Sequence, residues 1–182
     1  ESKVCLNKGP LELLLCPKNT KEHEAVLHAE VDGRDVHKAL LLAKAEAGSP
    51  VQFAPKYRPA SGTRIKVMLE YEEKGKKVRV PAQKWIKNMK DGKDLDSDWV
   101  FGGSRLVANA LDDKAPPRYL ANDGDLICIS NFDDAMLDLP INSPKEDADR
   151  AYEANAARIP AIGTPVVVIL EPVIEAKKPA KK

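Results

Sequence analysis

The most constraining feature of the sequence is the strict alternation of polar and apolar side chains over residues 63–71. A period of two residues is typical of a β-strand with one buried face and one exposed face. The segment 73–75 then predicts a turn, and residues 76–80 predict the returning strand. The middle of the chain is therefore predicted to be a β-hairpin.

Further segments also have strand character. Residues 10–16 and 25–31 alternate and are predicted to pair with each other as a hairpin. Residues 99–101 predict a short strand. Residues 125–131 contain a continuous apolar run, which predicts a central strand covered on both faces.

The last predicted strand, residues 164–170, begins with the same residues as the middle one. Pro-Ala-x-Gly-Thr stands at residues 59–63 and again at 160–164, and Val, Leu and Glu recur at matching places in the strands that follow. Gly before the strand allows a positive φ, whereas Thr and Val favour extended backbone. We interpret the two copies as equivalent turn-then-strand elements. They arose either by duplication or by coincidence, because the same residue types are common at turns.

One helix has clear boundary signals. Asp32 is a good cap, Asp35 lies in the acidic first turn, and Gly48 with Pro50 predicts the end. The sequence thus predicts an α+β protein with a mostly antiparallel, sandwich-like sheet and one main helix at about residues 33–47. We expect a single globular domain over residues 1–174 and a disordered Lys/Ala/Pro tail over 175–182.

Composition excludes some functional classes. The net charge is +1 and aromatic residues make up 5% of the chain, so we expect no nucleic-acid partner. No apolar run approaches the length of a membrane span. Residues 64–93 are rich in Lys and Arg and residues 94–149 are rich in acids. This polarity either has a functional use or, as is more usual, is solvated surface.

The three cysteines have no paired spacing. Cys5 and Cys16 flank a turn signal at residues 7–10, so a hairpin could bring them together as a disulfide in an oxidising compartment. The alternative is two half-buried thiols. The third cysteine, Cys128, has no partner signal.

Candidate metal ligands fall in two places. His23 and Glu24 belong to a histidine-rich stretch, but the spacing does not place two imidazoles on one helical or strand face. The Asp-x-Asp-x-Asp pattern at Asp94, Asp96 and Asp98 resembles the start of a calcium loop, although the required Gly and Glu are absent. Both are weak candidates, and no metal or cofactor is expected.

Ser104 follows two glycines, as a catalytic serine does in a nucleophile elbow. The pattern fails because Leu106 replaces the last Gly. A phosphate-binding Gly-rich loop is absent from the sequence, and three cysteines are too few for a four-cysteine iron–sulfur cluster.

Several ordered segments resemble the YdjY domain family from about Leu11 to Pro172. They are KEHE at 21–24, VHKALLL at 36–42, DWVFGGS at 98–104, DGDLI at 123–127, NF at 131–132, LDLP at 137–140, and IP with GT at 159–164. The resemblance implies a bacterial protein, often from planctomycetes, that carries an export or lipoprotein signal and would be periplasmic or membrane-anchored. The first residue, Glu1, suits the removal of such a signal. The resemblance implies no particular biochemical role.

The family's polar positions that match this chain are Lys21, His23, Glu24, Asp98, Ser104 and Asn131. The resemblance makes His23 and Glu24 a candidate base or ligand pair, with Ser104 as a further catalytic candidate and Lys21, Asp98 and Asn131 as ligand-binding candidates. The alternative is that these side chains satisfy backbone groups at turns.

Two functions therefore remain open. The favoured one is a non-catalytic exported domain that binds a protein partner or a polysaccharide-like ligand. The other is a hydrolase or lyase that uses His23 and Glu24, with or without a metal. The second requires those two side chains to meet within hydrogen-bonding distance in a cleft.

Overall fold

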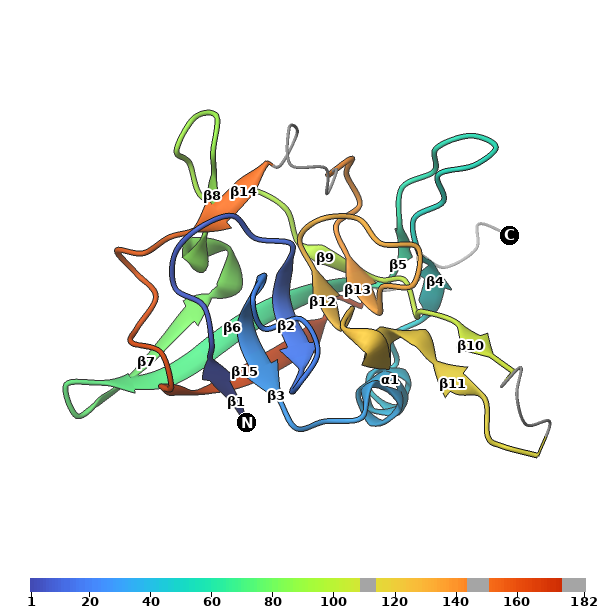
Figure 1. The fold of residues 1–182 in the computed structure, drawn as a ribbon, viewed down its shortest axis with the longest axis horizontal. Coiled ribbons are helices and arrows are strands. Elements are labelled where there is room, and N and C mark those ends of the chain that lie inside the picture. The colour runs from blue at the N-terminus through green and yellow to red at the C-terminus, as the bar shows by residue number, and fades with distance from the viewer. Residues whose placement is uncertain (109–113, 144–150, 175–182) are drawn as a thin grey trace, which may run out of the picture.

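A single sheet closes on itself into a β-barrel (Figure 1). The structure, a computed structural model, describes residues 1–108, 114–143 and 151–174. Eight strands follow one another around the ring in the order β15-β1-β3-β2-β12-β13-β9-β6, and the pairing of β6 with β15 closes it. Their bounds are β1 (Ser2–Val4), β2 (Leu13–Pro17), β3 (Ala25–Ala29), β6 (Arg64–Glu73), β9 (Trp99–Phe101), β12 (Ile127–Cys128), β13 (Leu137–Asp138) and β15 (Pro165–Pro172).

The predicted sandwich-like sheet is wrong. Alternation shows that each strand has one buried face, but it does not show whether that face packs against a second sheet or across the axis of a closed one. Here the inward side chains meet across the barrel, where Trp85, Trp99 and Phe101 are almost completely buried. The indole N–H of Trp99 donates to the Cys128 carbonyl at 2.7 Å.

The predicted hairpin of residues 10–16 and 25–31 is also wrong, because β2 and β3 pair in parallel. Residues 18–24 run back along the barrel, so β3 starts beside the beginning of β2. The Lys18 N–H donates to the Ala29 carbonyl at one end, and the Glu12 N–H donates to the Glu24 carbonyl at the other. The other edge of β3 pairs with β1, antiparallel.

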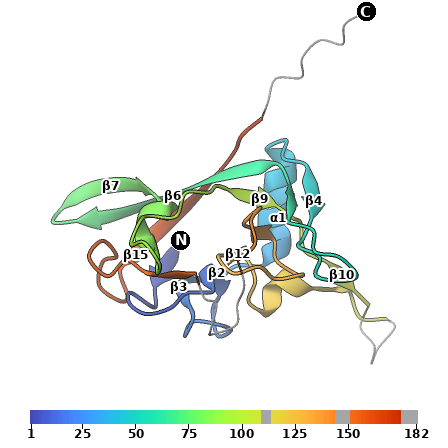
Figure 2. The ribbon, with the colours of Figure 1, turned by 90° about the horizontal axis from the view of Figure 1, so that it is seen from above.

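The middle hairpin is confirmed. β6 turns at residues 74–75 and returns as β7 (Lys76–Pro81), with Glu73 opposite Lys76. The strand β6 is long enough to have three partners. On one edge it pairs with β9 near the start of β6 and with β7 along the second half of β6, and on the other edge it pairs with β15. Both views show the β6–β7 hairpin projecting from the barrel (Figure 1, Figure 2).

The two repeated turn-then-strand elements lie side by side. They lead into β6 and β15, which pair antiparallel with Leu69 opposite Val168. The expected positive φ before each strand is confirmed, at +136° for Gly62 and +88° for Gly163.

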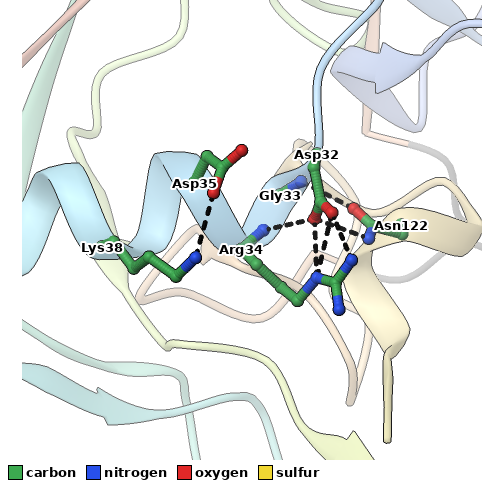
Figure 3. Close-up of polar contacts among 6 residues, drawn as sticks. All are labelled: Asp32, Gly33, Arg34, Asp35, Lys38 and Asn122. Atoms are coloured by element: carbon green, nitrogen blue, oxygen red, sulfur yellow. Dashed lines mark hydrogen bonds and ion pairs between the residues drawn. The ribbon is translucent and has the colours of Figure 1, made fainter. Parts of the chain in front are cut away.

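The helix α1 (Gly33–Leu42) is shorter than predicted. Asp32 caps it as expected, because its carboxylate accepts from the Arg34 N–H at 2.9 Å (Figure 3). The Asn122 side chain accepts from the Gly33 N–H and donates to Asp32. Hydrogen bonds from Arg34 and Asn122 hold the pKa of the Asp32 carboxyl well below its usual range.

The predicted end of the helix at residue 47 is wrong for a tertiary reason. Lys44 adopts a positive φ of +67°, and the chain then enters β4 (Ala47–Ser49), which pairs with β5 (Ser61–Gly62). Pairing with β5 takes these residues out of the helix that their composition favours.

Short elements complete the described chain. They are η1 (Ala82–Trp85), β8 (Ile86–Asn88), β10 (Leu106–Val107), β11 (Arg118–Tyr119), η2 (Leu120–Asp123) and β14 (Tyr152–Ala154). Residues 125–131 are buried throughout and contain β12, which lies between β2 and β13, so the prediction of a covered central strand is confirmed at that point. The predicted disordered tail, residues 175–182, lies outside the described residues. Within them, no helix has the length and apolar character needed to cross a membrane.

The two equivalent glycines give a matched test of the barrel closure. A Cβ at Gly62 would lie 2.1 Å from the Phe101 carbonyl oxygen, whereas a Cβ at Gly163 would meet nothing within 4 Å. We expect Gly163→Ala to cost about 1–2 kcal/mol of unfolding free energy, from backbone strain alone. Gly62→Ala should cost at least about 2 kcal/mol more, because the backbone of β9 must shift. Urea unfolding monitored by tryptophan fluorescence measures both; equal losses would contradict the predicted close approach.

Candidate functional site

Lys21 is a partly buried anchor for the segment 18–24. Its ammonium lies 2.8 Å from Asp125 Oδ1 and 4.3 Å from the centre of the Phe132 ring. Its methylene groups lie against Gly124, where a Cβ would come within 2.5 Å of the Lys21 Cδ. A side chain at residue 124 would therefore displace the Lys21 methylene groups, and the Lys21 charge ends on a buried carboxylate.

Asp125 belongs to a group of acids that we call the carboxyl cluster: Asp125, Asp134 and Asp138. The Asp125 side chain is only 4% exposed. Burial raises its pKa to about 6, Lys21 opposes that rise, and the neighbouring Asp134 carboxyl adds to it. Burial therefore makes the charged form of Asp125 harder to keep than that of an exposed aspartate.

Asn131 organises the second half of the cluster. Its amide nitrogen donates to Asp138 Oδ1 at 3.0 Å and to the Leu139 carbonyl at 3.1 Å, while its amide oxygen accepts from the Ser143 N–H at 2.7 Å. Tyr57 donates weakly to the same oxygen, at 3.4 Å. Asn131 is 1% exposed, so these bonds hold buried backbone together.

Asp138 is fully buried, and burial raises its pKa to about 7. Its Oδ2 has no hydrogen-bond partner among the described residues, and neither has the Ser143 hydroxyl. A buried, unpaired carboxylate oxygen is costly, which is why the neutral acid is favoured there. Because Asp125 and Asp138 are shielded from solvent, a ligand cannot reach them without a movement of the chain.

His23 and Glu24 are not hydrogen-bonded to each other in this structure. The closest ring nitrogen of His23 lies 3.8 Å from Glu24 Oε2, which is longer than a hydrogen bond, and the His23 side chain is 77% exposed. An imidazole in open solvent lacks the oriented partner that a general base requires.

Ser104 ties backbone segments together. Its hydroxyl donates to the Asp134 carbonyl and accepts from the Ala121 N–H. The nearby His37 ring is hydrogen-bonded to the Tyr119 hydroxyl at 2.9 Å. The Ser104 proton is thus directed at a carbonyl oxygen, and Ser104 holds the η2 segment against the loop between β12 and β13.

Asp94, Asp96 and Asp98 lie on one wall of an open trough of about 580 Å³ beside β6. Asp94 accepts from Lys84 and from Arg158, each at 2.8 Å. Asp98 accepts from Gln83 at 2.9 Å and lies 3.8 Å from Arg64. Ammonium and guanidinium groups thus occupy both carboxylate oxygens of Asp94. In the described part of the chain no group of three His, Cys, Asp or Glu residues is arranged to hold a metal ion.

The rest of the trough lining was not among the residues predicted from the sequence. It includes Arg64 and Lys66, which point outward from β6, and the apolar side chains of Met68 and Pro81. The alternation of residues 63–71 already placed these side chains on the outer face, so the signal was present. The carboxyl cluster was missed because Asp134 and Asp138 carry no local pattern.

The sequence candidates therefore divide among separate places. Lys21 contacts Asp125 and Asn131 contacts Asp138, which are two members of the carboxyl cluster. The charge of Asp125 contributes to the raised pKa of Asp138. Asp98 belongs to the trough, and His23 is exposed to solvent.

The three cysteines are thiols in this structure. The Cys5 thiol donates to the Ala25 carbonyl at 3.1 Å, and burial raises its pKa to about 12. Cys5 packs against a small apolar cluster that contains Cys16 and Cys128. The Cys5–Cys16 disulfide stays a prediction.

Comparison with known proteins gives one match. The family model of the YdjY domain matches residues 2–171, nearly the whole described chain. No curated protein and no solved structure matches.

Lys21→Met tests the partly buried anchor. Methionine keeps the length of the side chain but leaves the Asp125 carboxylate buried without its counter-ion, so we expect a loss of about 2–4 kcal/mol in unfolding free energy at pH 8. The matched control is Lys18→Met in the same segment, where the ion pair with Glu30 is exposed to solvent and should contribute little to stability. Urea unfolding measures both, and similar losses would contradict the anchoring role.

Asp138→Asn tests the carboxyl cluster by pH. The pKa of Asp138 rises on folding from 3.8 to about 7. Between these values the folded chain keeps a proton that the unfolded chain has lost, so stability falls as the pH rises from about 4 through 7. Asn at this position removes that fall, and the stability of the variant relative to wild type should increase by a few kcal/mol over the range, since a tenfold change in acidity equals about 1.4 kcal/mol.

Asp35→Asn is the control for the pH experiment, because Asp35 is exposed on α1. Chemical unfolding at a series of pH values measures all three proteins. A constant difference between Asp138→Asn and wild type across the range would show that the pKa of Asp138 does not rise on folding.

Proposed function

We propose, from the premise that this chain belongs to the YdjY domain family, that it is a non-catalytic module that binds a polysaccharide-like ligand. The proposed binding site is the trough beside β6. The observation that carries the proposal is the mixed lining of this open trough, in which cationic donors and carboxylates lie within reach of one another.

This mixed lining suits a polysaccharide, whose sugar units carry many hydroxyl groups. Each hydroxyl both donates and accepts, so a polyhydroxylated ligand needs carboxylates and cationic donors within reach of one another. Asp98 supplies an acceptor, and Arg64 and Lys66 supply donors. Met68 and Pro81 give an apolar surface for the C–H face of a sugar ring. The mixed charge fits a neutral ligand better than a strongly charged one.

Several of the polar groups are held in place before any ligand arrives. The Gln83 amide donates both to Asp98 and to the Ser97 carbonyl, which fixes the carboxylate on the wall. Lys84 and Arg158 hold Asp94 from two sides. Groups that are already ordered lose less conformational entropy on binding, which favours affinity.

The rival hydrolase or lyase function has less support. It needs His23 and Glu24 in contact inside a cleft, whereas the two groups lie 3.8 Å apart, His23 is 77% exposed, and neither side chain lines the trough. The proposal also keeps the extracytoplasmic location that the family resemblance implies; fractionation of cells that express the full-length protein would test it.

Isothermal titration of the chain with neutral oligosaccharides tests the proposal. We expect one of them to bind at a single site, and Asp98→Asn to weaken it by about tenfold, which corresponds to the loss of one charge-assisted hydrogen bond. Asp35→Asn, the same change on the exposed surface of α1, should leave the affinity unchanged. If no oligosaccharide binds, or if both variants behave alike, the trough is not a saccharide site.

A further inference from the structure

The closed barrel leaves one strand of its sheet with an open edge. Every strand of the ring has a neighbour on each side, whereas β7 pairs with β6 alone among the residues that the structure describes. The hairpin carries this edge away from the barrel wall (Figure 2). An open edge offers unpaired backbone N–H and C=O groups to any extended chain.

The register shows which groups are open. Pro81 has no N–H, so its pair with Met68 is of the non-hydrogen-bonded type, and types alternate along an antiparallel ladder. Arg79 and Lys77 therefore belong to the same type as Pro81. Their N–H and C=O groups point away from β6, toward the open edge.

A side-chain pocket lies beside this edge. It measures about 490 Å³ and is lined by Val80 and Pro81 of β7, with Tyr71 and Trp85 also in its lining. Lys84 and Arg158 stand at the same pocket and share the single carboxylate of Asp94. Strand addition gains affinity from backbone hydrogen bonds and specificity from pockets that take alternate side chains, and both features are present here.

The positive net charge of the hairpin favours an acidic partner. Residues 64–81, which form the hairpin, contain six Lys and Arg against three Glu, a balance of 6 − 3 = +3, with Lys77 paired to Glu70 and Arg79 to Glu171. A second copy of β7 would bring its own lysines against these, which disfavours self-pairing. An acidic strand has the complementary charge.

We propose that the open edge of β7 is a docking site for an extended acidic peptide segment, which adds to the sheet as a further strand. The peptide pairs with the backbone of Lys77 and Arg79, and one of its side chains enters the pocket beside Val80. This interaction uses the free edge of the hairpin rather than the trough, although Pro81 and Lys84 line both the trough and the pocket.

Fluorescence anisotropy with a labelled peptide of alternating Glu and Val tests the docking edge, with the full chain as receptor. Two variants separate backbone from charge: Arg79→Thr and Arg79→Pro both lose the guanidinium, but only proline also loses the open N–H. We expect Arg79→Pro to bind about tenfold more weakly than Arg79→Thr, from the lost hydrogen bond and the bulk of the ring. Circular dichroism confirms that each variant is folded.

A second measurement needs no variant of the protein. The same peptide with alternate backbone nitrogens methylated keeps its charge but cannot pair along a strand, so it should bind wild type about tenfold more weakly. Equal binding of the methylated peptide, equal affinities of the two Arg79 variants, or equal competition by single-stranded DNA of the same charge would each overturn strand addition. Failure of the parent peptide to bind wild type would overturn it as well.

Discussion

The ladder between β6 and β15 is the interaction on which the rest of the structure depends. It joins a strand from the middle of the chain to the last strand over seven consecutive residue pairs, from Val166 opposite Tyr71 to Pro172 opposite Ile65. Without it the sheet would have two long edges and an open core. Its closure encloses the buried tryptophans and fixes the outer face of β6, on which the trough lies. Because β6 is longer than the barrel wall requires, its second half carries β7 outside the ring.

Charged groups contribute differently to the structure inside and outside the barrel. Lys21 and the carboxyl cluster hold the segment 18–24 and the loop around Asn131 against the barrel, in surroundings where burial raises the pKa of two of the acids. The charges on the trough walls are open to solvent and paired with one another. The buried groups therefore matter for stability and its dependence on pH, whereas the solvent-facing groups form the binding site that we propose.

Local sequence predicted much of what is local in the structure. The alternation over residues 63–71 and the Asp32 cap gave the β6–β7 hairpin and the start of α1, since each depends on neighbours in sequence. The pairing partner of residues 10–16 was mispredicted, because a short connection usually makes a hairpin and here it runs back along the barrel. Of the candidate site residues, Lys21 and Asn131 do lie together, but around acids whose burial no pattern reveals.

The sequence by itself determined a β-rich chain with one helix, a hairpin in its middle, and glycines that start two matching strands, because periodicity and backbone preference act over a few residues. It also carried the family resemblance, which the match over residues 2–171 confirms. Only the tertiary structure decided that the sheet closes into a barrel, that the helix ends at Leu42, and that Asp125 and Asp138 are buried. These outcomes depend on contacts between residues far apart in the chain. The free energy of such contacts cannot be inferred from a local sequence pattern.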